Sequence, residues 1–342
     1  MSRPAAAGEI ADRLARRHVG VVLGVVDLSS GEQKILARGS TGRADGSAVT
    51  ADTFFEIGSI TKTFTALVLA SMVESGRVRL DTPVRDLLPA GIAVPVRDGA
   101  QITLEQLARH TSGLPRSPQS FARDLWIALI QQANPYTMDE EAVLAGLGEI
   151  RLKHRPGHGH GAYSNLGAGL LGIALRRAAE AGSYQELLSD AVLRPLGLSD
   201  TAVRLAPDQE ARLAQGHGMR HRPVDAWYLD GLAGAGALRS TAPDLLRYLR
   251  AQAEPDSTPL AEAIRLTHQL REPARRHTFG LGWMRTQLPT GDMWWHNGGT
   301  GGFRSFAGFS TDQRRVAAVL VNDGRGPETA GFELISGRRR AR

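Results

Sequence analysis

A serine and a lysine three residues apart are the first candidates for chemistry in this chain. Ser59 and Lys62 lie in the segment EIGSITK, where we expect Ser59 to open a helix and Lys62 to follow on the same face. A serine hydroxyl needs a base beside it to act as a nucleophile, and a lysine can be that base if burial or nearby cations lower its pKa. The alternative is a helix-capping serine and a solvated lysine. The pair alone leaves both interpretations open.

A tyrosine and an asparagine two residues apart form the second candidate group. Tyr163 and Asn165 lie in HGAYSNLGAG, a loop that leads into an apolar stretch typical of a helix. Side chains two residues apart point to the same side of an extended segment. A tyrosine near a cationic lysine can relay protons, and an asparagine both donates and accepts hydrogen bonds. The alternative is a packed aromatic ring followed by a capping asparagine.

A histidine followed by glycines forms the third group, in the segment WWHNGGTGGF. Glycines beside a strand are expected where a ligand must approach the backbone closely. The alternative is a flexible hairpin loop, which would not need the His-x-Gly beginning at His296 and Gly298. The segment has no lysine after its glycines, which excludes a phosphate-binding P-loop. A strand and not a helix is predicted to follow it, which excludes a dinucleotide fingerprint.

The three groups together, S-x-x-K, Y-x-N and H-x-G in this order, resemble the penicillin-recognising serine hydrolases. The Y-x-N form is similar to the branch of class C β-lactamases, D-Ala-D-Ala carboxypeptidases and related esterases. The flanking segments GRVRLDTPVRDLLP, ITLEQLARHTSGLP and FGLGW extend the resemblance over about residues 18–325. It implies that Ser59 is the acylated nucleophile, Lys62 its proton partner and Tyr163 the general acid and base.

The same resemblance implies substrate contacts. Asn165 would bind the acyl amide of the substrate, and His296 would orient Tyr163 or a substrate carboxylate. Gly298 and Gly299 would line the site, and the backbone N–H groups of Ser59 and Gly299 would form an oxyanion hole. The chain departs from typical class C β-lactamases because His296 stands in place of a lysine. A neutral imidazole anchors a carboxylate more weakly than an ammonium group does. Asn297 likewise stands in place of a small hydroxyl residue.

The elements that must position these residues follow from hydrophobic patterning. We expect a helix over residues 7–18, a hairpin over 19–39, and a helix from Ser59 that Gly76 ends. Late strands are predicted at 279–288, 303–310 and 314–323, with a tight turn at 311–313. The fold class is therefore α/β, with an antiparallel sheet built from both termini and flanked by helices, plus a mostly helical inserted domain. This is the β-lactamase/transpeptidase-like fold that the resemblance implies. The predicted domains are 1–58 with 275–342, and 59–274, with the active site at their seam.

Composition narrows the classes of protein. The 342 residues are 42% hydrophobic and 22% charged, which is typical of a globular chain. The net charge of +6 includes arginines near the C-terminus, which we interpret as a solubilising surface and not a nucleic-acid site. The absence of cysteine excludes disulfides and thiolate metal sites. His158 and His160 lack a nearby carboxylate, and no metal is predicted; His110 is expected to make a structural hydrogen bond.

The sequence predicts no membrane span and no cofactor, and it leaves the oligomeric state open. The N-terminal segment has no apolar signal region, which favours the cytoplasm, or a secreted or periplasmic protein if a leader was removed. The function predicted is hydrolysis of a small substrate, a β-lactam, D-amino-acid peptide or small ester, through an acyl-enzyme on Ser59. The alternatives are a transacylase that passes the acyl group to an amine, and a non-catalytic binding protein. The presence of Ser59, Lys62 and Tyr163 disfavours the binding protein.

Overall fold

The computed structural model describes residues 6–118, 121–131, 133–158, 162–270 and 277–337. Its largest element is a seven-stranded antiparallel sheet in the order β2-β1-β12-β11-β10-β9-β8. The strands are β1 (Gly20–Asp27), β2 (Gln33–Gly39), β8 (His277–Phe279), β9 (Met284–Leu288), β10 (Gly291–Gly299), β11 (Arg304–Ser310) and β12 (Arg315–Val321). The two ends of the chain meet where β1 pairs with β12, with Val21 opposite Val321. The predicted fold class is confirmed.

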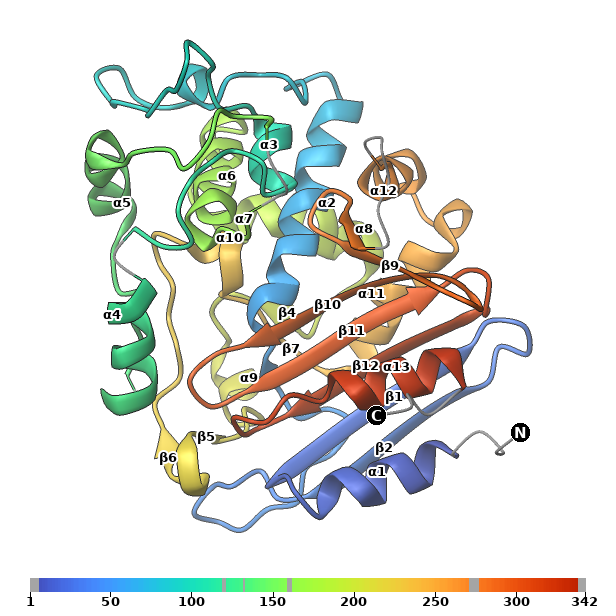
Figure 1. Cartoon of the computed structure of the whole chain (residues 1–342). Helices are drawn as coiled ribbons and strands as arrows, with labels where there is room; N and C mark the ends of the chain where they lie inside the picture. Colours follow the sequence, from blue (N-terminus) through green and yellow to red (C-terminus); the bar gives the residue numbers. More distant parts are fainter. Residues whose placement is uncertain (1–5, 119–120, 132, 159–161, 271–276, 338–342) are drawn as a thin grey trace.

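Helices cover both faces of this sheet (Figure 1). The faces belong to different core clusters because side chains alternate along a strand. Val21 and Leu23 pack in the cluster that contains α1 (Ala7–Ala15) and α13 (Glu328–Ser336). Val22 and Val26 belong to the larger cluster, which contains α11 (Ala242–Ala253). A strand buried on both faces explains why the sequence of β1 is an almost continuous apolar run.

The rest of the described chain is mostly helical and lies beside the sheet (Figure 1). Its α-helices are α2 (Thr61–Glu74), α3 (Leu104–Ala108), α4 (Phe121–Trp126), α5 (Glu140–Gly146), α6 (Asn165–Ala178), α7 (Tyr184–Leu188), α8 (Arg194–Leu196), α9 (Pro207–Glu210), α10 (Ala233–Gly236) and α12 (Ala261–His268). Short helical turns are η1 (Gly58–Ile60), η2 (Val84–Leu87), η3 (Ile127–Gln131), η4 (Leu147–Glu149), η5 (Ser189–Leu193), η6 (Met219–His221) and η7 (Pro255–Ser257). Two small sheets consist of β3 (Phe55–Glu56), β7 (Arg239–Ser240) and β4 (Thr201–Ala202), and of β5 (Gly216–His217) and β6 (Pro223–Val224).

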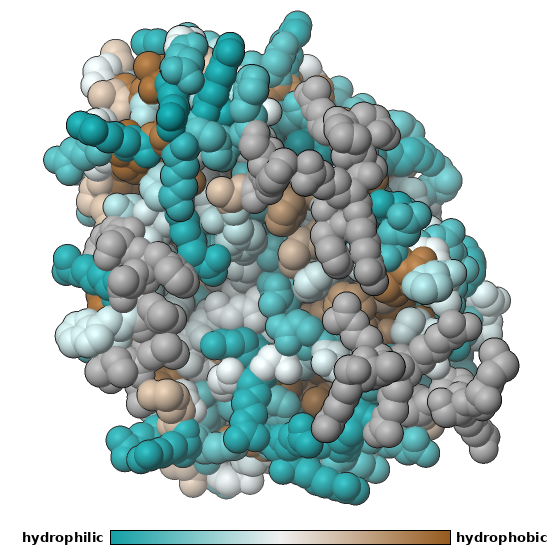
Figure 2. All heavy atoms as spheres, in the orientation of Figure 1, coloured by the Kyte–Doolittle hydropathy of each residue, from teal (hydrophilic) through white to brown (hydrophobic). Residues whose placement is uncertain are grey.

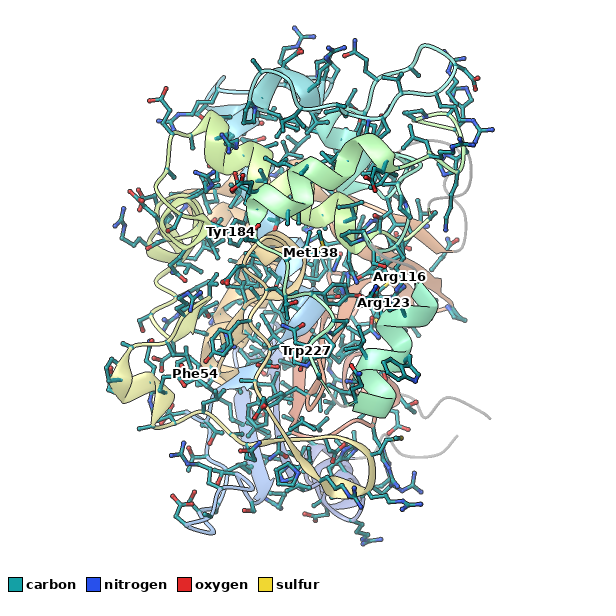
Figure 3. The ribbon with its side chains drawn as sticks, turned by 90° about the vertical axis from the view of Figure 1, so that its left-hand side faces the viewer. Phe54, Arg116, Arg123, Met138, Tyr184 and Trp227 are labelled. Carbon is teal, nitrogen blue, oxygen red and sulfur yellow. The ribbon has the colours of Figure 1, made fainter. Side chains whose placement is uncertain are left out.

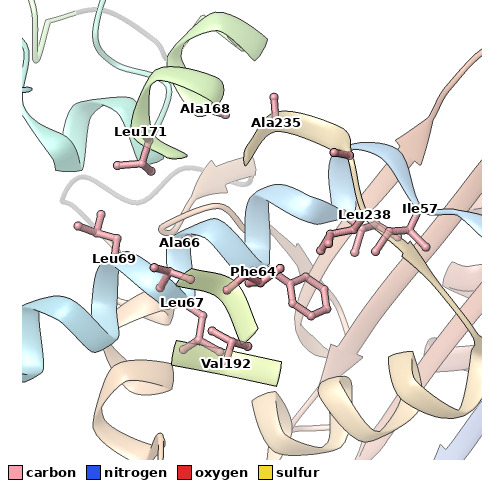
Figure 4. Packing of buried hydrophobic residues seen from close by; sticks show 14 of the residues in the cluster. Ile57, Phe64, Ala66, Leu67, Leu69, Ala168, Leu171, Val192, Ala235 and Leu238 are labelled. Carbon is pink, nitrogen blue, oxygen red and sulfur yellow. The ribbon is translucent and has the colours of Figure 1, made fainter. Parts of the chain in front are cut away.

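Helix α2 is the centre of the core (Figure 4). Its predicted apolar residues are buried, and so are polar residues on its other sides. The threonines tolerate burial because each hydroxyl has a partner: Thr61 donates to Gly58 O, Thr63 to Ile60 O, and Thr65 to Gly234 O. The helix ends as predicted, before Gly76. The φ of +70° at Gly76 is in the left-handed region that glycine adopts readily.

The predicted domain bounds at residues 58/59 and 274/275 stay a prediction. One hydrophobic cluster runs across the first of these positions, with Ile57 and Phe64 in the same core. Helix α11 lies within the predicted helical domain and shares a core cluster with strand β1 of the sheet. The seam between the two parts is therefore filled with packed side chains.

Two local expectations need refinement. The segment of the third motif is itself a strand, β10, where the sequence indicated a glycine-rich stretch beside a strand. The single strand expected over 279–288 is divided into β8 and β9, because Gly282 turns the chain with a φ of +70°. The tight turn predicted at 311–313 is confirmed by the bond from Arg314 N to Thr311 O.

The face in Figure 2 is mainly hydrophilic, with hydrophobic residues in small patches between polar ones. Across the described ranges, no helix is both long and apolar enough to cross a membrane. The C-terminal arginines Arg338, Arg339, Arg340 and Arg342 lie outside the described residues, as does His160.

Candidate active site

Ser59 lies at the junction between strand β3 and helix α2. Strand β3 is fixed by its pairing with β7, in which Glu56 faces Arg239. The two side chains form a buried ion pair of 3.3 Å, and Glu56 also accepts a hydrogen bond from Trp227 N. Burial raises the pKa of Glu56, and the charge of Arg239 opposes this shift. Gly58 then turns the chain with a φ of +51° into η1, which places Ser59 at the start of the buried helix.

Lys62 lies one turn further along, and its amine faces Ser59. Lys62 Nζ is 3.0 Å from Ser59 Oγ and donates to Ala235 O at 2.5 Å. The residue is only 3% exposed, which contradicts the alternative of a solvated lysine. Burial, and then the positive charge of Arg116, hold the pKa of Lys62 well below its ordinary value. The site therefore favours the neutral amine, which is able to accept a proton.

Tyr163 approaches the same two side chains from the loop before α6. Its hydroxyl is hydrogen-bonded to Ser59, and Lys62 Nζ lies 5.0 Å from the centre of its ring. The next residue, Ser164, caps α6 by accepting from Gly167 N and anchors the loop by donating to Pro115 O. Burial raises the pKa of Tyr163 despite its bond to Ser59. Tyr163 is therefore a neutral phenol, ready to donate a proton, and not a standing phenolate.

His110 holds the Tyr163 loop in place. Its Nδ1 accepts a hydrogen bond from Ser164 N at 3.2 Å, and its ring lies 4.5 Å from the Tyr163 ring. Burial lowers the pKa of His110 well below its ordinary value, so that the ring stays a neutral acceptor. The structural hydrogen bond expected for His110 is confirmed.

Asn165 is the first residue of α6 and lies in the same group. Its Nδ2 donates to the hydroxyl of Tyr136 at 2.9 Å, while its Oδ1 is buried without a hydrogen-bond partner among the described residues. Tyr136 in turn lies edge-on to Trp227, with ring centres 5.9 Å apart. The side chain of Asn165 therefore still has an acceptor for a ligand.

Strand β10 supplies the opposite wall of the site. His296 is 1% exposed, and its ring centre lies 6.1 Å from that of Tyr163. Its Nε2 is buried without a partner in the described part of the chain. Burial lowers the pKa of His296 to about 3, so that the imidazole is neutral. Asn297 points to the other face of the sheet, where it donates to Glu328 at 2.8 Å.

Gly298 lets β10 lie directly against the segment before the serine. A Cβ at Gly298 would lie 1.9 Å from Ile57 O, and one at Gly58 would lie 2.6 Å from Gly299 N. Both close contacts therefore require glycine, because any side chain at these positions would overlap the neighbouring backbone. The close approach brings the Gly299 amide next to Gly58, which directly precedes Ser59. An oxyanion hole formed by the N–H groups of Ser59 and Gly299 requires such an arrangement.

Replacing Gly298 by alanine is expected to destabilise the protein by about 1–3 kcal/mol, because a methyl group would overlap the backbone of Ile57. Thermal unfolding and kcat/KM for an activated ester measure the effect. Gly299→Ala is the matched control: its Cβ would meet only the Arg304 side chain, at 3.1 Å, and the backbone N–H is kept. Equal unfolding temperatures for both variants and the native protein would contradict the role of Gly298.

Some members of the site carried no signal in the sequence. Ala235 contributes only its carbonyl oxygen, which no side-chain pattern reveals. Tyr136 lies far from the three motifs in sequence. Arg116 directly follows HTSGLP, and its carbonyl accepts from Asn165 N at 2.8 Å while its guanidinium carbon lies 5.1 Å from the Tyr163 ring centre. Figure 3 shows Arg116 and Arg123 on the face that also carries Trp227. For Arg116, the sequence offered one signal, which is its position directly after the segment HTSGLP.

Comparisons with known proteins identify the class. The fold is that of serine hydrolases built on the antiparallel sheet of β-lactamases, and the protein is a serine hydrolase. The chain belongs to the Beta-lactamase family, whose sequence model matches residues 7–337. The resemblance predicted from the three motifs is therefore confirmed.

Individual relatives agree with this assignment. The chain is 29% identical to the D-alanyl-D-alanine-carboxypeptidase/endopeptidase AmpH of Escherichia coli, over 94% of this chain and 85% of AmpH. It is 27% identical to penicillin-binding protein 4 of Amycolatopsis lactamdurans, over 86% of this chain and 78% of that protein. The crystal structure of a β-lactamase/D-alanine carboxypeptidase from Pseudomonas syringae superposes with a TM-score of 0.82 at 22% identity, covering 99% of this chain and all of that one.

Proposed function

We propose that this serine hydrolase cleaves an amide or ester bond through an acyl-enzyme on Ser59, with Lys62 as the base. The observation that carries the proposal is the 3.0 Å separation of Lys62 Nζ and Ser59 Oγ in a buried site where the neutral amine is favoured. A neutral amine at this distance can take the hydroxyl proton as the oxygen attacks a carbonyl carbon.

The proposed steps use the groups around Ser59 in turn. Lys62 accepts the Ser59 proton, and the backbone N–H groups of Ser59 and Gly299 stabilise the negative oxygen of the tetrahedral intermediate. Tyr163 donates its hydroxyl proton to the leaving group and regains a proton from Lys62. Water then attacks the acyl-enzyme, loses a proton through the same relay, and releases Ser59. Every proton is returned, so that no cofactor is needed to balance the cycle.

For the substrate, we propose a peptide ending in D-alanine, with β-lactams as acylating analogues. The names of AmpH and penicillin-binding protein 4 support this class. The neutral His296 would hold the carboxylate, which a terminal D-alanine and a β-lactam both carry, more weakly than a lysine would. No contact within the described residues favours an amine over water as acceptor, and transfer to an amine stays a prediction.

A substrate panel tests this proposal. Purified protein is given diacetyl-L-Lys-D-Ala-D-Ala, a chromogenic cephalosporin and p-nitrophenyl butyrate, and the release of D-alanine, opened lactam and nitrophenol is measured. We expect D-alanine release and ester hydrolysis, with slower turnover of the cephalosporin. Rapid cephalosporin turnover without D-alanine release would assign the protein to the β-lactamases instead. Reaction with none of the three would contradict the proposed function.

The pH dependence follows from the direction of two pKa shifts. Lys62 must be neutral to act as base, and its pKa is lowered, so kcat/KM should rise with pH and level off well below the pKa of a free lysine. The pKa of Tyr163 is raised, so its phenol stays protonated and no fall is expected below about pH 10. Steady-state kinetics between about pH 5 and pH 10 measure the profile. A decline between neutral pH and pH 9, with chemistry rate-limiting, would contradict these roles.

A further inference from the structure

A second cavity lies beside the glycine-rich end of β10. Its volume is about 350 Å³, which is in the range of small-molecule sites. Three arginines from separate segments line it: Arg220 in η6, Arg304 at the start of β11, and Arg325 after β12. His221 and Gly301 also line it. We call this space the arginine cavity.

Two of the three arginines that line the cavity have no ion-pair partner among the described residues, whereas Arg304 lies within the influence of Glu328 and Asp323. Arg220 and Arg325 are exposed, and neither forms an ion pair with a described residue. The lining contains one acid, Asp323, whose carboxylate is hydrogen-bonded to His18 Nδ1 at 2.9 Å, to Val19 N at 3.1 Å and to Arg325 N at 3.0 Å. Exposed arginines that line one space without an ion-pair partner, as Arg220 and Arg325 do, are suited to bind a carboxylate or a phosphate through paired N–H groups.

Backbone geometry presents two of the lining side chains. Arg220 and His221 have φ values of +58° and +56°, in the left-handed region that residues other than glycine adopt uncommonly. Two consecutive residues in this region turn the chain sharply at the rim of the cavity. Residues held in sparsely populated backbone regions are concentrated at ligand sites.

Two sets of contacts connect the arginine cavity with the proposed active site. On one side, Arg304 borders Gly299, where a Cβ would lie 3.1 Å from Arg304 Nη1. Nη1 of Arg304 is fixed by Thr300 O and Phe303 O, which holds the guanidinium at this place. The cavity therefore begins next to the glycine that we propose for the oxyanion hole.

The other set of contacts leads from Asn165. Asn165 bonds to Tyr136, Tyr136 lies against Trp227, and a Cβ at Gly301 would lie 2.5 Å from Trp227 Nε1. Gly301 lines the arginine cavity. Since Asn165 is the residue expected to hold the acyl amide, the cavity lies on the acyl side of the scissile bond.

We propose that the arginine cavity is a subsite for an anionic group, a carboxylate or a phosphate, at the far end of the acyl part of the substrate. The inference deepens and rests on the proposed acyl-enzyme function of Ser59. If so, Arg220 and Arg325 give substrates with an acidic acyl group a higher kcat/KM than neutral substrates of equal reactivity.

The kinetic test compares mono-p-nitrophenyl esters of dicarboxylic acids, from succinic to suberic acid, with p-nitrophenyl butyrate. In the native protein, kcat/KM should exceed that of the butyrate for at least one chain length. The variant Arg220→Gln/Arg325→Gln should lower this advantage about tenfold while kcat/KM for the butyrate stays within twofold. The control Arg77→Gln/Arg151→Gln removes the same net charge from two exposed arginines elsewhere and should change neither.

An equal loss in the control pair, or no charge preference at any chain length, would overturn the subsite. Calorimetric titration with citrate and with inorganic phosphate tests anion binding without catalysis. The anion that binds shows whether the cavity takes a carboxylate or a phosphate. We expect saturable binding that is at least tenfold weaker in Arg220→Gln/Arg325→Gln. Absence of binding of both anions to the native protein would also overturn it. Failure of all esters to react, with citrate or phosphate still bound, would instead locate the error in the proposed function.

Discussion

Replacement of Ser59 by alanine is expected to abolish ester and peptide hydrolysis, with kcat lowered by at least about 10⁴-fold. The substitution removes only the hydroxyl group. Ser59 is half-buried and lies in a 3₁₀ turn, and the backbone hydrogen bonds of this turn do not depend on the Ser59 side chain. The fold should therefore persist. Stopped assays with p-nitrophenyl butyrate measure the loss, and thermal unfolding checks that the structure is retained.

Ser71→Ala is a suitable control for this substitution, because Ser71 lies on the same helical segment away from Lys62. It should retain native kcat. If Ser59→Ala kept more than about a hundredth of the native rate, the nucleophile would be another group. Without the nucleophile, the remaining groups of the site would support a much lower rate than this.

Replacement of Lys62 by arginine is expected to lower kcat by about 10²–10⁴-fold, the usual contribution of a proton acceptor. Arginine brings a permanent positive charge and stays protonated, so it cannot accept the proton of Ser59. The reaction should fail at every pH, in contrast to the native profile that rises with pH. Activity assays at several pH values measure the result.

Two further variants make the Lys62 result decisive. Lys62→Met keeps the volume of the side chain without its amine and guards against misfolding caused by the larger guanidinium. The linkage of pKa and stability predicts that this variant is more stable than the native protein near neutral pH, because the native fold holds an amine that the unfolded chain would protonate. Lys34→Arg, at an exposed position of β2, is the control for a lysine-to-arginine substitution outside the site. Native activity in Lys62→Arg would contradict the base assignment.

The sheet and the central helix could be predicted because their sequences repeat at the expected periods. The valines of β1 form a run that is typical of a strand covered on both faces, and the apolar spacing of α2 is typical of a helix. The strand character of β10 was hidden by its glycines, which have low strand propensity. They are tolerated there because Gly298 must pass close to Ile57.

The three motif groups were also predictable, whereas the contacts that tune them were not. The spacing of Ser59 and Lys62 places both on one face of a helix, but burial of the amine depends on Ala235 and on the distant α10. The contact of Arg116 with Tyr163 arises because its carbonyl accepts from Asn165 N. Such backbone-mediated contacts join segments far apart in sequence, and no local pattern records them.

The most direct test of the acyl-enzyme is mass spectrometry of the intact protein after reaction with penicillin G and rapid acid quenching. A covalent adduct on Ser59 should raise the mass by that of one penicillin molecule, and peptide mapping should locate it in the segment EIGSITK. Ser59→Ala should show no adduct under the same conditions. An adduct on any other residue of the native protein, or an equal adduct in Ser59→Ala, would contradict the central claim that Ser59 is the nucleophile.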